Sequence, residues 1–289
     1  WGIRLDGRPV RTPGRVALAV PAESLAEAIA AEWETVGETV DPRAMPLTGL
    51  ANAAIDRVAP DPAAFAQGLG RYAEADLACY RAEGPRELAD RQAESWDFLL
   101  GWARRRFDVD FATTCGVMHV AQPGATVQRL AHAVAALDPF RLAGLSPLVT
   151  IGGSLVAALA VLEGALTPEA AWEAVTIDDQ WQREQWGADA EAELALANRR
   201  HGAALGSRFF LGGQARVVLR FGACPRELGR RRLQLAALLD QEGGLVTPVL
   251  GKIGVAPDAP VSGNPVLLVT PLAVPVTCWD LREGQSLAA

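Results

Sequence analysis

Short runs of alternating apolar and polar residues open the chain, and a single amphipathic segment follows them. Within residues 1–20, two alternating runs flank Asp6-Gly7, which is the strongest short signal for a hairpin turn. A second turn sequence follows at Pro13-Gly14. The pattern therefore predicts a β-hairpin at the start of the chain.

One helix is predicted after the hairpin, because apolar side chains recur on one helical face. Ser24 and Glu27 have the spacing of a capping box, and Gly37 marks the end of the helix. The apolar face makes Trp33 a core residue, and it consists of Leu25, Ile29, Trp33 and Val36. Residues 45–56 then mix apolar side chains with polar ones that we expect to bond neighbouring backbone.

From residue 61 the apolar spacing is helical throughout a long region. Asp61-Pro62 has the sequence of a helix start, and a long helix with Trp96 on its apolar face is expected from Pro85. Residues 116–120 have the composition of a short strand. Further helices are predicted at about residues 125–137, 139–164, 168–186 and 188–211, two of them opened by Asp138-Pro139 and Thr167-Pro168.

These elements predict an α+β fold with segregated layers. Residues 1–60 would form a small β-rich N-terminal domain with one helix, and residues 61–212 an all-helical domain. Residues 213–289 form a proline- and glycine-rich tail of uncertain fold. Its β-prone pieces, such as residues 243–255 and 264–279, are broken by proline and suit edge strands rather than a central sheet.

The charge of the chain argues against a nucleic-acid partner. Its formal net charge is −7, and the basic residues do not outnumber the acidic ones in the body up to residue 212. An acidic body offers no electrostatic attraction to phosphate backbones. The cysteines lack Cys-x-x-Cys spacing, so we expect reduced thiols in a cytosolic compartment and no metal site: Cys79, Cys115, Cys224 and Cys278.

One apolar run, residues 148–162, needs testing as a membrane span. As a helix it would cover about 22 Å, against roughly 30 Å of hydrocarbon in a bilayer. It also contains Gly152 and Gly153 in the middle. We therefore expect a buried helix and no membrane insertion. Since the chain opens with Trp1 rather than Met, the sequence leaves a targeting peptide open.

No sequence motif of catalysis or cofactor binding occurs in the chain. Phosphate-binding loops, dinucleotide fingerprints and G-x-S-x-G sequences are missing, and the histidines at 119, 132 and 201 are far apart. His119, in an apolar run, is more typical of a hydrogen-bonded structural histidine than of a general base. We predict a binding protein with no catalytic residues and no cofactor.

Residues 176–187, TIDDQWQREQWG, combine two tryptophans with acids and amides. A continuous helix would place Asp178, Trp181, Gln182 and Gln185 in one stripe. Trp186 would point about 140° away from Trp181, so one ring can pack in the core while the other meets a partner. Taken alone, the stretch favours the simpler interpretation, in which both rings pack in the core and the polar side chains are solvated.

Five stretches in this order resemble one known family: LDGRPVRTP (5–13), AIAAEWETVG (28–37), MPLTGLANAAID (45–56), RYAEADLACYRAEGP (71–85) and GSLVAALAVLEGALTPEAAWEAVTIDDQWQREQWG (153–187). The family is the assembly chaperone of F-type ATP synthase that binds the alpha subunit of the catalytic head. The resemblance spans the chain up to about residue 212, and the tail has no counterpart in it.

The resemblance implies an ATP-independent chaperone with a β-containing N-terminal domain and a helical C-terminal domain. It would hold unassembled alpha subunit, hide the surface that later contacts the beta subunit, and hand alpha over to beta. The expected location is the bacterial cytoplasm, or the mitochondrial matrix for eukaryotic relatives. We expect a monomer whose partner is the alpha subunit.

The resemblance also implies site residues. The acidic residue that opens the W-G motif is Asp178, whose side chain is shorter than the glutamate of some relatives. The expected client-binding residues are Asp178, Asp179, Trp181, Gln182, Gln185 and Trp186. The expected structural residues are Trp33, Asn52, Asp56 and Gly187. We predict that Asp178 is a solvated carboxylate on the helix surface that contributes little to folding.

Two alternatives remain open from the sequence. One is a small hydrolase in which interdomain carboxylates, such as Asp178 and Glu184, act on a substrate. The other is a helical scaffold for a different client. Pull-down with alpha and beta subunits distinguishes these alternatives from the assembly chaperone.

Overall fold

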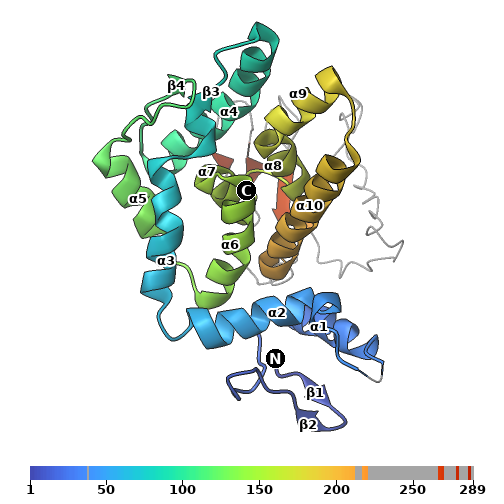
Figure 1. Ribbon diagram of the computed structural model, residues 1–289. Helices are drawn as coiled ribbons and strands as arrows, with labels where there is room; N and C mark the ends of the chain where they lie inside the picture. Colours follow the sequence, from blue (N-terminus) through green and yellow to red (C-terminus); the bar gives the residue numbers. More distant parts are fainter. Residues whose placement is uncertain (38, 212–216, 221–265, 270–277, 280–285, 288–289) are drawn as a thin grey trace, which may run out of the picture. The chain divides into compact units, whose positions relative to one another are not determined.

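The computed structural model describes residues 1–37, 39–211, 217–220, 266–269, 278–279 and 286–287. Contacts divide the chain into two compact units, Trp1–Gln214 and Ala215–Ala289. The first unit is mostly helical with a few short strands (Figure 1), and the helical character after residue 61 agrees with the sequence. The expectation that residues 1–60 are β-rich with one helix is wrong, because two α-helices, Glu23–Glu34 and Pro46–Ala53, lie in the described part of this segment beside two strands of two residues each. A separate domain that ends at residue 60 is not confirmed, because the N-terminal elements fall in the same unit as the helices after them.

The predicted hairpin is present at the start of the chain. Strands β1 (Arg4–Leu5) and β2 (Arg8–Pro9) pair antiparallel around Asp6 and Gly7. Both turn residues have positive φ, 52° and 77°, as a type I′ turn requires.

Asp56 connects the second turn of this segment to the helices. Its carboxylate accepts hydrogen bonds from Thr12 Oγ1 at 2.7 Å and from Gly14 N at 2.8 Å. A Cβ atom at Gly14 would lie only 2.6 Å from Asp56 Oδ1, so this approach requires glycine.

Helix α1 (Glu23–Glu34) begins without the predicted capping box. Ala22 occupies the N-cap and provides no side-chain hydrogen bond, so the assignment of Ser24 and Glu27 to a capping box is wrong. Glu32, near the end of α1, instead caps the next helix, α2 (Pro46–Ala53). Its carboxylate accepts from the Leu47 and Thr48 amides at 2.7 and 2.8 Å, and from Thr48 Oγ1 at 2.7 Å.

Trp33 lies on α1 and packs against the core, but it is half-buried rather than fully buried. Its indole Nε1 and the Asn52 Oδ1 are buried atoms that have no hydrogen-bond partner among the described residues. Between α1 and α2 lies the 3-10 helix η1 (Pro42–Ala44), capped by Asp41. After α2 the chain continues as the π-helix η2 (Ala54–Val58), which packs on α6.

The helices of the following region mostly begin where their caps predict. Asp61 accepts from Ala64 N at the start of α3, Asp138 from Phe140 N and Arg141 N at the start of α6, and Thr167 from Ala170 N at the start of α8. The bounds are α3 Pro62–Gly70, α4 Arg86–Phe107, α5 Gly124–Ala135, α6 Pro139–Gly152, α7 Leu155–Leu162, α8 Pro168–Val175, α9 Ile177–Trp186 and α10 Ala190–Leu211. Two 3-10 helices, η3 (Arg71–Glu74) and η4 (Leu77–Cys79), follow α3.

Two helices that the sequence predicts as continuous are each divided. The first breaks between α6 and α7, where Gly153 has φ 69° and the Ser154 side chain accepts from Ala157 N. The second breaks between α8 and α9 at Thr176, whose φ of −114° lies outside the helical range. Apolar spacing continues through both breaks, which is why the pattern alone does not reveal them.

A short parallel pair joins η4 to the loop after α4. Strand β3 (Tyr80–Arg81) pairs with β4 (Thr114–Cys115). The strand expected at residues 116–120 is therefore wrong, since the paired residues precede it and Gly116 turns the chain with φ 81°. His119 in this segment is exposed, and its Nδ1 lies 3.2 Å from the Tyr80 hydroxyl.

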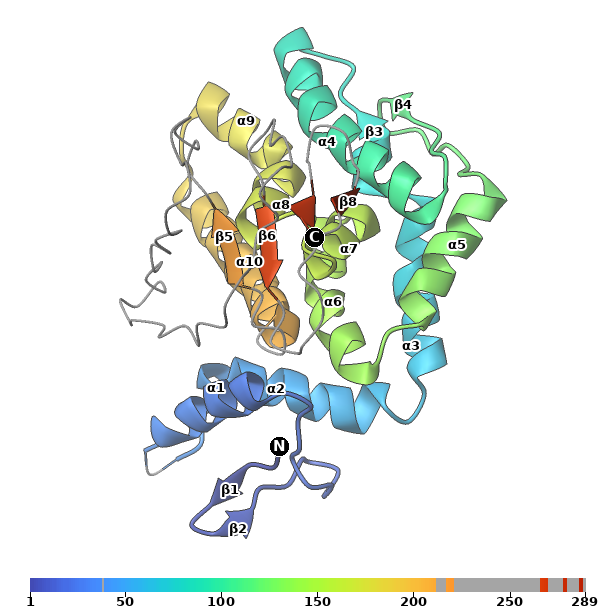
Figure 2. The ribbon, with the colours of Figure 1, turned by 180° about the vertical axis from the view of Figure 1, so that it is seen from behind.

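The core of the first unit surrounds α6 and α7. Both views show these helices with α3, α4 and α5 on one side and α8 and α10 on the other (Figures 1 and 2). The α7 residues from Leu155 to Val161 are all buried, as expected for the apolar run at 148–162. Of the helices that the structure describes, none is both long enough and apolar enough to cross a membrane.

Asp76 fixes the start of α7 from within the core. It is fully buried, and its carboxylate accepts from Ser154 Oγ at 2.7 Å, Val156 N at 2.9 Å and Ala78 N at 3.0 Å. Burial raises the pKa of Asp76, although these hydrogen bonds act in the opposite direction. Burial, together with the Asp76 carboxylate, also raises the pKa of the Cys79 thiol to about 12. We therefore expect Cys79 to be unreactive.

Helix α10 lies very close to α6 because both carry glycine at the contact. A Cβ atom at Gly206 would lie 2.6 Å from the Gly144 carbonyl oxygen and 2.5 Å from Leu148 Cδ1. A Cβ atom at Gly202 would lie 2.8 Å from Ile151 Cδ1. Small residues at these positions let the two helices approach more closely than larger side chains would allow.

The second unit contains four short strands among its described residues. They form an antiparallel sheet in the order β5 (Val217–Arg220), β6 (Val266–Val269), β7 (Cys278–Trp279) and β8 (Ser286–Leu287). Two of these strands lie in the predicted β-prone piece at residues 264–279, and the piece at 243–255 lies outside the described residues.

Candidate binding surface on helix α9

Helix α9 contains all six residues expected to bind a client, and it lies beside α4 (Figure 1). Its direction differs from that of α8 because of the break at Thr176. The buried Thr176 hydroxyl donates to Trp172 O at 2.7 Å, and the same oxygen accepts from Gln180 Nε2 at 2.9 Å. These bonds connect the Thr176 side chain to both α8 and α9.

Asp178 faces α4 and is only partly exposed to solvent. It is half-buried, and its Oδ1 accepts a hydrogen bond of 2.6 Å from Gln92 Nε2. Gln92 is buried, and its Oε1 accepts from the Ala82 amide at 2.7 Å. The prediction that Asp178 is a solvated carboxylate is therefore wrong, because it is the acceptor for a buried amide on the neighbouring helix.

Arg91 of α4 holds the next turn of α9. One of its guanidinium nitrogens lies 2.9 and 2.7 Å from the two oxygens of Glu184. The same guanidinium lies 4.9 Å from the centre of the Trp181 ring, within the range of a cation–π contact. Trp181 is half-buried, so this side of α9 contacts α4 through charge and aromatic stacking.

Arg81 of β3 and Trp96 of α4 make further contacts around the α4–α8 packing, next to the start of α9. The Trp96 indole donates to the Ala174 carbonyl oxygen of α8 at 2.7 Å. Arg81 lies 5.1 Å from the centre of the Trp96 ring, donates to Gln92 O at 2.6 Å and pairs with Asp97 at 2.8 Å. Burial lowers the pKa of Arg81, while the Asp97 carboxylate acts in the opposite direction.

The opposite edge of α9 contacts α10. Asp179 is half-buried and lies 3.2 Å from a guanidinium nitrogen of Arg199. The Arg199 guanidinium also lies 5.8 Å from the centre of the Trp172 ring of α8. One cation thus connects α8, α9 and α10.

The remaining expected client-binding residues are exposed. Gln182 and Gln185 lie on the outward side of α9, and 79% of the Trp186 surface is accessible. Gly187, with φ 85°, ends the helix directly after Trp186. The two tryptophans differ, since Trp181 is half-buried and Trp186 is exposed, so the interpretation in which both rings pack in the core is wrong. We call Gln182, Gln185 and Trp186 the α9 surface.

The expected residues therefore fall into two groups. Asp178, Asp179 and Trp181 face neighbouring helices, whereas the α9 surface faces outward. Sequence reasoning missed the partners on α4, Arg91 and Gln92. Gln92 lies 86 residues from Asp178 in the chain, and no local pattern connects the two.

The carboxylates of the hydrolase alternative are already engaged in these contacts. Asp178 bonds Gln92, and Glu184 pairs with Arg91. They hold α9 against α4 and do not form a pair of free acids. Within the described ranges, no group of three or more His, Cys, Asp or Glu side chains has the geometry of a metal site.

Comparison with known proteins shows which family this helical unit resembles. The family model "ATP12 chaperone protein" matches residues 1–104. Atp12 from Paracoccus denitrificans is 44% identical with a TM-score of 0.71, over 74% of this chain and 92% of that protein. The Atu1473 protein from Agrobacterium tumefaciens is 36% identical with a TM-score of 0.69, over 73% of this chain and 79% of that protein.

A third relative is more distant. The protein "atp12, mitochondrial" from Schizosaccharomyces pombe is 27% identical over 202 residues, which cover 66% of this chain and 69% of the yeast protein. The bacterial matches are closer, and one of them is covered almost completely. The chain belongs to the ATP12 chaperone family, a family of chaperones and not of enzymes.

Proposed function

We propose that the protein is an ATP-independent assembly chaperone for the alpha subunit of the F-type ATP synthase catalytic head. It binds unassembled alpha, shields the surface that later contacts beta, and releases alpha when beta arrives. Family membership carries this proposal, with 44% identity over nearly all of Paracoccus denitrificans Atp12. An exposed subunit interface is a large apolar patch that promotes aggregation, so shielding it has a physical benefit.

The α9 surface is the part of the molecule that we propose contacts alpha. Trp186 offers a large, rigid aromatic ring of the kind that dominates binding energy at interfaces, and the amides of Gln182 and Gln185 lie around it. Contacts to α4 and α10 hold the other sides of helix α9 in place. A surface that is already ordered loses little conformational entropy on binding, which favours affinity.

Asp178, Asp179 and Trp181 have a positioning role in this proposal. Each bonds or stacks on a residue of a neighbouring helix, and those contacts fix the rotation of α9 about its axis. That rotation determines which side chains face outward. Replacing any of these three residues would weaken alpha binding because Trp186 would be misoriented, and not because a direct contact with alpha is lost.

The direct test uses purified full-length protein and isolated alpha subunit, without nucleotide. We expect the protein to suppress aggregation of alpha, measured by light scattering, at a stoichiometric ratio. Addition of beta should then release alpha, detected by size-exclusion chromatography. Equal protection of beta, or retention of alpha in the presence of beta, would support a scaffold for another client and overturn this proposal.

A further inference from the structure

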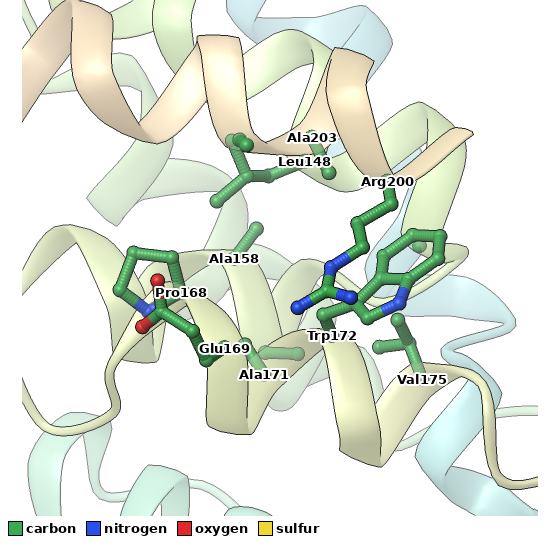
Figure 3. A pocket seen from close by; sticks show the side chains of 12 residues that line it. Leu148, Ala158, Pro168, Glu169, Ala171, Trp172, Val175, Arg200 and Ala203 are labelled. Carbon is green, nitrogen blue, oxygen red and sulfur yellow. The ribbon is translucent and has the colours of Figure 1, made fainter. Parts of the chain in front are cut away.

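A recess opens between α8 and α10, and residues of α6 and α7 complete its wall (Figure 3). Its cavity volume is about 70 Å³. Apolar side chains make most of its wall, among them Leu148 of α6, Ala158 of α7, Ala171 and Val175 of α8, and Ala203 of α10. Cavities lined in this way are poor sites for water and good sites for an apolar group.

Arg200 reaches into this recess from α10, beside Trp172, while Glu169 and Pro168 lie on the opposite side (Figure 3). No carboxylate in the described part of the chain forms an ion pair with Arg200. Its neighbour Arg199 differs, because it pairs with Asp179 at 3.2 Å. The recess thus combines an apolar wall with an exposed cation that is available to a partner.

The recess is linked to helix α9 through the chain and through the side chain of Arg199. Helix α8, which forms one wall, leads into α9 after the break at Thr176. Trp172 lines the recess, and Arg199 joins Trp172 to Asp179 of α9.

We propose that the recess receives a large apolar side chain of the alpha subunit, next to an acidic residue that pairs with Arg200. This inference rests on the proposed function and specifies which feature of the client is recognised. The apolar wall excludes a charged side chain from the recess, because burial of an unpaired charge is costly. Glu169 on the far side repels an acid there, so the two charges set the direction of the bound segment.

The first experiment reverses the charge of Arg200 in the full-length protein. Arg200→Glu should weaken binding of alpha by about tenfold at low salt, since an attraction at the interface becomes a repulsion. Arg200→Gln should weaken it less. The difference should shrink in 0.5 M NaCl, because salt screens exposed charges. Arg208→Glu is the matched control, because Arg208 is exposed on the same helix and lies outside the recess wall.

The second experiment fills the recess. Ala203→Leu should weaken alpha binding by about tenfold or more, since the new side chain occupies the volume that the client needs. Thermal melting checks that the variant is folded. If Ala203→Leu is not folded, the Arg200 variants, which alter an exposed side chain, test by themselves whether the recess binds alpha.

A photo-crosslinking residue, p-benzoylphenylalanine, in place of the exposed Ala204 identifies the occupant. We expect one dominant crosslink, to an alpha segment in which a large apolar residue neighbours Asp or Glu. A crosslink to residues 215–289 of the same chain, or to an alpha segment without an acid, overturns the inference.

The outcomes separate this inference from the proposed function. If the parent protein holds alpha and both Arg200→Glu and Ala203→Leu bind as tightly as the parent, the recess is not a client site and the chaperone proposal stands. If the parent protein does not hold alpha at all, both proposals fail. Tighter binding of alpha by Arg200→Glu than by the parent contradicts the expected acid.

Discussion

Helices α9 and α10 are neighbours in the chain, yet they are attached to the body in different ways. Helix α10 packs on α6 through glycine, at distances where a Cβ atom at Gly206 would clash with the Gly144 carbonyl oxygen. Helix α9 contacts α4 through the pairs Gln92–Asp178 and Arg91–Glu184 and the stacking of Arg91 on Trp181. No residue of α9 is fully buried, whereas α10 buries Phe209.

The difference indicates a division of roles. Close apolar packing contributes most of the stability of a fold, so α10 belongs to the body of the protein. Exposed ion pairs contribute little stability, with a median of about 0–1 kcal/mol each. Polar contacts of this kind have directional geometry, and they suit a helix whose main requirement is orientation. The following predictions test this comparison.

The largest effect is expected at the α6–α10 contact. Gly206→Ala should destabilise the protein by about 2 kcal/mol or more, because the added Cβ atom would meet backbone 2.6 Å away and overpacking is costly. Urea unfolding measures the change. Gly68→Ala on α3 is the matched control, since nothing lies within 4 Å of its Cβ position. That variant should be slightly more stable, because alanine favours helix. An equal change in unfolding free energy for Gly206→Ala and Gly68→Ala would contradict the claim that close packing at Gly206 stabilises the protein.

A smaller effect is expected at the α4–α9 contact. Asp178→Ala leaves the buried Gln92 amide without its acceptor, which should cost about 1–2 kcal/mol. Asp178→Asn retains a carbonyl oxygen that can accept the same bond, so its stability should stay within about 0.5 kcal/mol of the parent. Thermal melts of both variants measure the difference. An unchanged melting temperature for Asp178→Ala would show that the Gln92 bond does not support the fold.

The smallest effect is a difference in local stability between the two helices. Hydrogen exchange should be faster for amides of α9 than for the inner turns of α10, because few apolar contacts hold α9. In 1 M NaCl the α9 amides should exchange faster still, since salt screens the Arg91–Glu184 and Arg199–Asp179 pairs. Exchange in α10 should not change. Equal protection of both helices at either salt concentration would argue against separate roles.

Local signals in the sequence were sufficient for much of the fold. Asp6-Gly7 determines the hairpin because both residues tolerate positive φ, and Asp61 caps its helix through a bond to an amide three residues on. The capping box at Ser24 fails because the N-cap is Ala22, so the helix begins two residues earlier than the box requires. The break at Thr176 is not predicted, since the apolar spacing continues through it.

The candidate site was predictable only in part. The separation of Trp181 and Trp186 around a helix shows that their rings point in different directions, and the structure has Trp181 half-buried and Trp186 exposed. The interpretation that the stretch alone favours, with both rings in the core, is wrong for Trp186. The environment of Asp178 depends on Gln92, far away in the chain, so its burial could not be inferred from helical spacing. The recess at Arg200 also needs the packing of four helices, which no single stretch encodes.

The replacement of Trp186 tests most directly whether the α9 surface binds the alpha subunit, as we propose. We expect Trp186→Ala to weaken alpha binding by roughly tenfold or more, the effect typical of an aromatic residue at the centre of an interface. The melting temperature should be unchanged, because 79% of the Trp186 surface is exposed. Phe98→Ala is the control, since Phe98 is an aromatic residue of α4 with 54% exposure. Parent-like binding by Trp186→Ala, or an equal loss with Phe98→Ala, would contradict the claim.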